Sequence, residues 1–276
     1  MAEGRAAAAE VPGAQAVRRA MAVLRIVAMG QDDGVRLVDI SAMSGLSRPT
    51  VHRLLKVLIE ETAVEQDPQT RRYRAGDELP LLGLARGGRL PMRALAEPYL
   101  QALAAEVGDT VFLSVRHGAD SVCVARCPGT HAIQVLSIPI GARRPLGASV
   151  SGLVLLAALP PPEADALTQA NATRLQLLQR DPDEVRRQVR AARRAGHAHA
   201  PHGVMPGTAA LGVPVRDAQG HVVAAISVAA LRERLDRPRL PAVLAAMQQQ
   251  ALLVGRRHDE VHAPRGHGAA PSRKGP

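Results

Sequence analysis

The chain has 276 residues, with 35 Lys and Arg against 25 Asp and Glu, so its formal net charge is +10 at pH 7. Such a charge makes acidic partners such as nucleic acid the first to consider. One Phe, two Tyr and no Trp argue against modules that stack RNA bases on exposed aromatic rings. No apolar run approaches the ~20 residues of a membrane span, no signal peptide is visible, and two Cys are too few for a disulfide framework. We therefore expect a cytoplasmic protein of one large or two ordinary domains.

The N-terminal third has helical periodicity. Apolar residues from Val17 to Ala28 repeat at 3.6-residue spacing, and Gly30 and the following Asp-Asp-Gly end the pattern. The remaining elements expected in this part are helices at 38–44 and 48–60, strand and turn signals at 64–74, and a connecting helix at 77–86. We expect a disordered tail at 1–13, a domain at 14–76 and a linker helix at 77–90.

From Pro91 onward, short strands alternate with helices. The expected helices are 92–107, 149–158, 163–169, 183–195 and 239–254. The expected strands are 110–115, 121–125, 133–138, 208–215 and 222–228. Because short turns join several of these strands, we expect an antiparallel sheet with helices packed on it. This second domain would span 91–256, followed by a disordered tail at 257–276.

The segment 37–58 has the spacing of a helix-turn-helix, in which a tight turn joins two helices. Gly45 suits the turn because glycine adopts positive φ without strain. Ser47 is a good N-cap for the second helix, and Pro49 falls in its first turn, where a missing amide hydrogen is tolerated. The apolar residues expected to face the core are Ile40, Leu46, Val51, Leu54, Leu55 and Leu58.

The other face of the second helix is polar and basic, with no acid between Ser47 and Ile59. Such a face can enter the major groove of DNA, pairing Arg with guanine edges and cations with phosphates. The alternative is an amphipathic helix with a solvated basic face, but the coincident turn glycine, N-cap and early proline favour DNA binding. The candidate contacts are Ser47, Arg48, Pro49, Thr50, His52, Arg53 and Lys56.

A basic stretch at 71–74 lies where a winged helix-turn-helix has its β-hairpin wing. Arg71, Arg72 and Arg74 could reach phosphates or the minor groove. Taken alone, a short basic run is more often solvated surface.

From Gln15-Ala16-Val17-Arg18-Arg19-Ala20 to Tyr73-Arg74-Ala75-Gly76, the chain resembles the IclR family of bacterial transcriptional regulators. The resemblance continues at 145–152, 196–214 and 224–229, and so covers about 14–256. It implies an α+β protein with a winged helix-turn-helix, a linker helix that helps dimerisation and a GAF-like domain that binds a small effector. Family members act as homodimers or homotetramers and repress or activate transcription. Because a two-fold dimer favours a two-fold site, we expect a partly palindromic operator, and we expect no cofactor.

The resemblance also locates the effector site. Family members that bind small carboxylates use an Asp, a Cys and two Ser, and these places here hold Ala200, Ala210, Ser227 and Ala229. A less polar pocket would compensate a small anion poorly for its lost water, so we expect a larger, more apolar effector or a site that has decayed. The implied site residues are Leu136, Ala148, Ser149, Val150, Ser151, Ala200, His202, Ala210, Ser227 and Ala229.

Two other functions stay open at this point. His197, His199 and His202 would suit a metal-responsive regulator, although no Cys or acid lies close by in sequence to complete a site. Ser149 and Ser151 invite a comparison with a nucleophilic serine, but the surrounding pattern is not that of a nucleophile elbow. We therefore expect neither a metal site nor an enzyme. A strongly basic helix at 183–195 is expected to be a solvated face or a secondary contact with an acidic partner.

Overall fold

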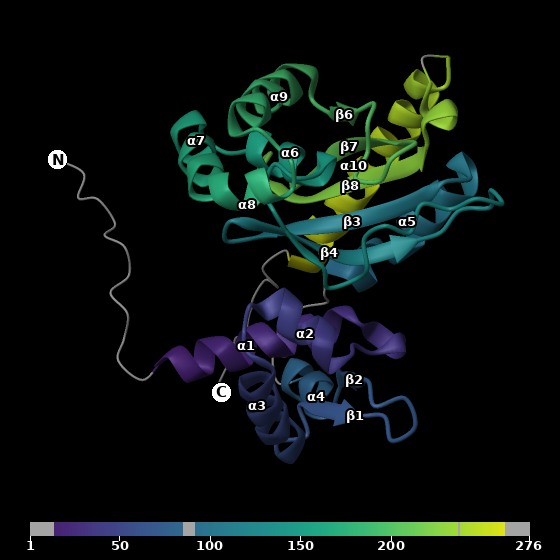
Figure 1. Ribbon diagram of the computed structural model, residues 1–276. Helices are drawn as coiled ribbons and strands as arrows, with labels where there is room; N and C mark the ends of the chain where they lie inside the picture. The colour runs from purple at the N-terminus through teal and green to yellow at the C-terminus, as the bar shows by residue number, and fades with distance from the viewer. Residues whose placement is uncertain (1–13, 85–91, 237, 263–276) are drawn as a thin grey trace, which may run out of the picture. The chain divides into compact units, whose positions relative to one another are not determined.

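The computed structural model describes residues 14–84, 92–236 and 238–262. Its N-terminal part is a group of helices with one β-hairpin (Figure 1). The elements are α1 (Ala14–Met29), α2 (Leu37–Ser44), α3 (Arg48–Glu60), β1 (Val64–Gln66), β2 (Tyr73–Ala75) and α4 (Glu78–Leu84). This order of helices and hairpin is that of a winged helix-turn-helix, as the sequence predicts.

The N-terminal core lies between α1, α2, α3 and the hairpin. Its buried residues are Val23, Ile26, Val27, Ile40, Val51, Leu55, Val64 and Tyr73. The predicted apolar face of α3 is confirmed, since Leu54 and Leu58 pack at the edge of this cluster. The predicted stripe of α1 is wrong in its first half. Val17 is 65% exposed and Met21 is 43% exposed, because the buried row of α1 begins only at Val23.

The rest of the chain is built on a six-stranded sheet. The helices are α5 (Met92–Val107), α6 (Val150–Ala157), α7 (Pro161–Ala170), α8 (Ala172–Leu177), α9 (Pro182–Ala195) and α10 (Leu240–His262). The strands are β3 (Thr110–His117), β4 (Asp120–Cys127), β5 (Arg143–Pro145), β6 (Ala198–Ala200), β7 (Thr208–Arg216) and β8 (Val222–Leu231). Strand order is β5-β4-β3-β8-β7-β6, and the register pairs β8 antiparallel with both β3 and β7.

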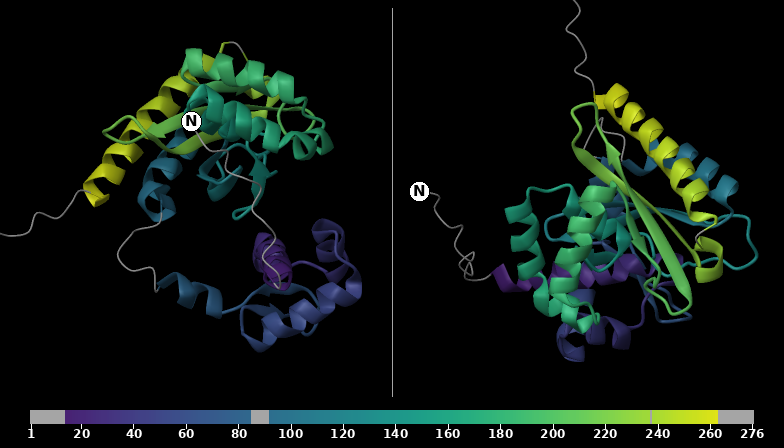
Figure 2. Two further views of the ribbon diagram at one scale, coloured as in Figure 1. Left: turned by 90° about the vertical axis from the view of Figure 1, so that its left-hand side faces the viewer. Right: turned by 90° about the horizontal axis from the view of Figure 1, so that it is seen from above.

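Helices cover both faces of this sheet (Figure 2). The long helices α5 and α10 pack against each other on one face, where α10 crosses β7. On the opposite face α6 lies against β7 and β8, with α9 packed on α6. The α+β architecture expected from the sequence is therefore the one observed.

Five elements differ from the sequence prediction. The expected strand at 133–138 is irregular, because Gln134 turns inward to bond backbone carbonyls while Ile133 and Leu136 are exposed. The short elements β5, β6 and α8 were not predicted, since three to six residues hold too little periodicity to be recognised. Finally, α10 continues to His262, so 257–262 is helical rather than part of a tail.

Several expectations concern residues outside the described part of the chain. The linker prediction at 77–90 is matched by α4 as far as Leu84. The remainder of that linker, the tail at 1–13 and residues 263–276 lie outside the described residues.

Candidate functional site

The outer face of α3 presents the candidate contacts to solvent. Val51 and Leu55 point into the core, so His52, Arg53 and Lys56 stand on the opposite side and are exposed. Arg48 and Pro49 open the helix and are also exposed, with Pro49 in the first turn as predicted. The helix therefore separates an apolar face from a cationic one.

The charges on this face are largely uncompensated. Among the described residues, the acid that approaches the face is Glu60, whose carboxylate lies 3.9 Å from the Lys56 ammonium group. Exposed Arg and Lys without a fixed acidic partner lose little when they exchange water for phosphate or a base edge.

The start of α3 is fixed by a short network of hydroxyl groups. Ser47 has the extended backbone of an N-cap, but its hydroxyl pairs with the Thr50 hydroxyl at 2.9 Å, with no side-chain bond to an amide. Gly45 ends α2 at φ +68°, as the turn prediction requires. The Ser41 hydroxyl then donates to the Leu46 carbonyl at 2.6 Å and ties α2 to the turn. These bonds set the angle at which α3 is presented.

The β-hairpin formed by β1 and β2 has the position of the wing. Its register pairs Glu65 with Arg74, and an isolated bridge joins Val35 to Tyr73. The connecting turn is closed by Asp67, whose carboxylate accepts the amides of Gln69 and Thr70. These hydrogen bonds hold the pKa of Asp67 below its ordinary value, and the bond from the Thr70 amide contributes most to the shift.

The three predicted wing arginines have different environments. Arg74 pairs with the Asp67 carboxylate and lies 3.6 Å from Glu65. Arg72 donates to the carbonyls of Asp33 and Gly34. Arg71, in contrast, is exposed at the tip with φ +58°. The sequence grouped these three residues, but two of them make internal bonds that hold the wing in place.

Most of the effector residues implied by the resemblance lie on the face of the sheet that α6 covers, and Leu136 and His202 do not. The registers align Ala200 with Ala210, and Ala210 with Ala229, so three alanines form a row across β6, β7 and β8. All three are half-buried. The side chains of this alanine row are methyl groups, which offer no hydrogen bonds.

The polar end of the same face involves two serines. The Ser151 hydroxyl donates to the Ser227 hydroxyl at 2.9 Å, and both residues are buried. Ser149 caps α6 by accepting the Gly152 amide. The neighbouring Ala148 and Val150 are buried in the cluster beneath α6.

Two of the proposed effector residues are not enclosed. Leu136 lies in the irregular segment after β4, with its side chain 49% exposed. His202 is exposed, and its Nδ1 lies 2.8 Å from an Arg232 nitrogen. These two residues contribute to no buried site within the described chain.

Sequence inspection missed one polar residue of this face. Thr110 is fully buried and pairs with Ala229 in the register, so it extends the alanine row onto β3. Its hydroxyl donates to Gln134, whose amide group also bonds Gly129, Gly108 and His131. The sequence predicts both β3 and β8, but a local sequence pattern does not show which strands pair with each other.

The geometry gives no support to the metal and serine alternatives. Among the described residues, no three His, Cys, Asp or Glu side chains gather where they could hold an ion. Burial, and then the neighbouring His197, lowers the pKa of His199. Ser149 and Ser151 are hydrogen-bonded as described above, to an amide and to Ser227. Burial raises the pKa of the Cys123 thiol to about 11, as expected of a core thiol.

None of the helices in the described part of the chain is long and apolar enough to cross a membrane.

Comparison with known proteins identifies both parts of the chain. The IclR helix-turn-helix domain matches residues 16–68, and the bacterial transcriptional regulator IclR C-terminal domain matches residues 86–256. The chain is 30% identical over 250 residues to the HTH-type transcriptional regulator XynR of Escherichia coli strain K12, covering 89% of this chain and 98% of that protein.

Solved structures agree with this match. A crystal structure described as an IclR transcriptional regulator from Silicibacter sp. TM1040 is 26% identical, with a TM-score of 0.69, covering 88% of this chain and 96% of that one. An IclR homolog from Microbacterium hydrocarbonoxydans, complexed with 4-hydroxybenzoate, has a TM-score of 0.64 at 23% identity, covering 89% and 99%. The chain belongs to the IclR family of bacterial transcriptional regulators, in which a helix-turn-helix domain binds DNA and a C-terminal domain binds a small-molecule effector.

Proposed function

We propose that α3 enters the major groove of an operator and that the exposed cations on its outer face make the contacts. The observation that carries this proposal is the exposed basic face of α3, which contains no Asp or Glu between Ser47 and Ile59. Arg48, Thr50, His52 and Arg53 would contact base edges near the start of the helix, and Lys56 would contact a phosphate. Ser47 and Pro49 would face the DNA backbone at the N-terminus of α3.

In this proposal the wing makes a smaller contact than the sequence suggested. Arg71 is the wing arginine placed to reach a phosphate or the minor groove. Arg72 and Arg74 would stabilise the position of the wing, Arg72 through its bond to the Gly34 carbonyl and Arg74 through its ion pair with Asp67.

The units of function would follow the boundaries predicted from the sequence. We propose a DNA-binding domain at 14–76, a linker helix at 77–90 and an effector domain at 91–256. Two or four copies would act together in the cytoplasm on a partly palindromic operator, since a two-fold protein assembly favours a two-fold site.

We further propose that the effector is less polar than a small carboxylate. The alanine row offers methyl groups where a polar site would offer hydrogen bonds, which favours a ligand with a substantial apolar surface. The 4-hydroxybenzoate bound to the Microbacterium hydrocarbonoxydans homolog is a ligand of that kind. Thermal-shift measurements should therefore show stabilisation by aromatic acids rather than by pyruvate. Strong stabilisation by pyruvate that Ser227→Ala removes would contradict this proposal.

Footprinting of genomic fragments by the full-length protein would identify an operator and allow the α3 proposal to be tested. On that operator, Arg53→Ala should weaken binding by about 1–3 kcal/mol and relax the preference for one base pair. Arg187→Ala is the matched control, because Arg187 is an exposed arginine on α9 that pairs with Glu184. Unchanged affinity and base preference in Arg53→Ala would reject the role assigned to that residue.

A further inference from the structure

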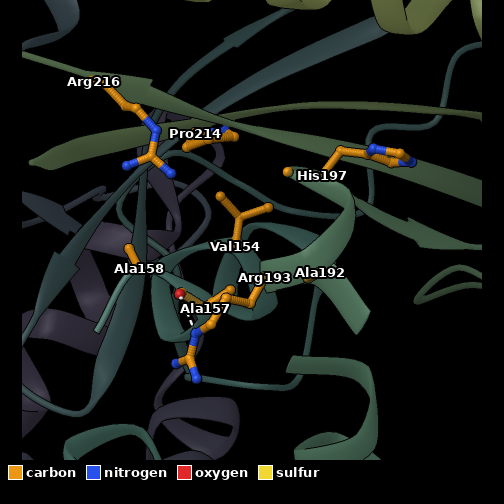
Figure 3. A pocket seen from close by; sticks show the side chains of 9 residues that line it. Val154, Ala157, Ala158, Ala192, Arg193, His197, Pro214 and Arg216 are labelled. Atoms are coloured by element: carbon orange, nitrogen blue, oxygen red, sulfur yellow. Dashed lines mark hydrogen bonds between the residues drawn. The ribbon is translucent and has the colours of Figure 1, made fainter. Parts of the chain in front are cut away.

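A hollow lies beside the C-terminal half of α6, whereas the paired serines lie near the start of this helix. Figure 3 shows the side chains that line the hollow. Its volume is about 50 Å³, which is room for a few water molecules or a short alkyl chain. Val154, Ala157 and Pro214 provide an apolar floor. Along α6, Val154 lies about 4.5 Å from Ser151 and Ala157 lies about 9 Å from it, so the hollow is displaced from the serine pair toward the C-terminal end of the helix.

One cation points over the hollow. The pairing of β7 with β8 shifts register between Val215 and Arg216, an irregularity of the kind that redirects a side chain at the end of a strand. In Figure 3 the Arg216 guanidinium extends from β7 toward Val154 and Ala158. One of its nitrogens donates to the Gly220 carbonyl at 2.8 Å, and the residue is exposed. The remaining guanidinium hydrogens can serve a ligand.

A second cation borders the hollow. Arg193 also lines it and donates to the carbonyls of Ala157 and Leu159, so it neutralises the C-terminal end of α6. The residues that line the hollow include no Asp or Glu.

The charges of α9 increase the positive potential at this place. In the first half of the helix Arg186 pairs with Asp183, and Arg187 pairs with Glu184. In the second half, Arg190 and Arg194 are exposed and form no ion pair with the described residues. The excess charge of this basic helix is therefore concentrated at the end that borders the hollow.

We propose that this hollow is a second ligand site, which binds a short-chain aliphatic carboxylate. The carboxylate would accept hydrogen bonds from Arg216, whose planar guanidinium matches the geometry of a carboxylate. The alkyl chain would lie on Val154, Ala157 and Pro214, and the small volume favours a short alkyl chain over an aromatic ring. The alanine row and this hollow would thus select different classes of small molecule.

The test is calorimetric titration of the full-length protein with butyrate, with butyramide and butylamine as uncharged and cationic probes of the same size. We expect saturable binding of butyrate and much weaker binding of the other two. Arg216→Gln should weaken butyrate binding at least about tenfold, because it removes a charged hydrogen-bond donor. Ala158→Leu should also weaken it by filling the exposed rim of the hollow.

Two control variants make the test specific. Arg187→Gln removes an arginine that is paired on α9, and Ser227→Ala alters the effector face, so both should bind butyrate as the parent does. Absence of saturable binding, equal binding of butyramide, or equal loss in Arg216→Gln and Arg187→Gln would overturn the proposal. Loss in Ser227→Ala with retention in Arg216→Gln would instead assign butyrate to the alanine row and would also overturn it.

Discussion

At the residue scale, the buried hydroxyl pair beneath α6 has a measurable energetic signature. Ser227→Ala leaves the Ser151 hydroxyl buried without its acceptor, which should cost about 1–3 kcal/mol of unfolding free energy. The double variant Ser151→Ala/Ser227→Ala removes both groups, so its loss should be smaller than the sum of the two single losses. Urea denaturation of the four proteins measures this coupling. Strictly additive losses would show that the bond contributes nothing.

Gly255 provides a second residue-scale prediction, in which two effects oppose each other. Alanine is the better helix former by about 1 kcal/mol, but a Cβ here would lie 2.1 Å from the Arg216 carbonyl oxygen. Because the obstacle is backbone, Gly255→Ala should lower stability by about 1–3 kcal/mol or more. Gly83→Ala in α4 is the control, since a Cβ added there would meet no atom of the described residues within 4 Å and the change should be neutral or stabilising. Equal thermal shifts for the two variants would reject the packing argument.

At the element scale, we expect two arginines of the wing to have different roles: Arg71 contacts DNA, and Arg74 stabilises the hairpin. Arg71→Ala should weaken operator binding, lower the slope of log affinity against log salt by about one per contacting copy, and leave thermal stability unchanged. Arg74→Ala should instead loosen the hairpin, because Asp67 and Glu65 lose their shared cation. Fluorescence anisotropy at several salt concentrations, with thermal denaturation of each variant, distinguishes the two roles. Matching behaviour of the two variants would contradict the assignment.

The stability of the turn that joins β1 and β2 should also decrease at acidic pH. The Thr70 and Gln69 amides and Arg74 favour the ionised Asp67 carboxylate and lower its pKa. The ionised Asp67 carboxylate therefore stabilises the folded turn at pH values above the ordinary pKa of Asp. This stabilisation is lost as the pH falls through the lowered pKa of the folded state. NMR titration of the Thr70 amide should give a midpoint below 3.8, and Arg74→Ala should raise it. A wild-type midpoint at or above 3.8 would show that the turn does not favour the carboxylate.

The elements also show what the sequence could reveal. The positions of α3, Gly45 and Pro49 follow from local chemistry, which is why the helix-turn-helix was predicted nearly to the residue. The distinct roles of Arg71 and Arg74 depend on hairpin register, and the place of Thr110 depends on strand pairing. These pairings depend on the tertiary structure, so composition and periodicity cannot predict them.

At the scale of the whole molecule, the proposals give the chain one helix that reads DNA and a C-terminal domain with two ligand sites. Any effector that favours one arrangement of the DNA-binding domains must bind that arrangement more tightly, and operator DNA must then change effector affinity by the same factor. The sign of regulation follows from which arrangement the operator selects. This reciprocity makes effector titration in the presence and absence of operator a direct measure of coupling.

The proposed two-fold assembly predicts how the operator must be built. If two copies bind together, scrambling one half-site should lower affinity by roughly 10²-fold or more, since the second contact no longer adds to the first. Inserting five base pairs between the half-sites should have a comparable effect, because it places them on opposite faces of the duplex. Anisotropy with the three DNA duplexes, alongside sedimentation of the free protein, provides the measurement. Equal affinity for all three duplexes would show that one copy binds alone and would refute the two-fold assembly on DNA.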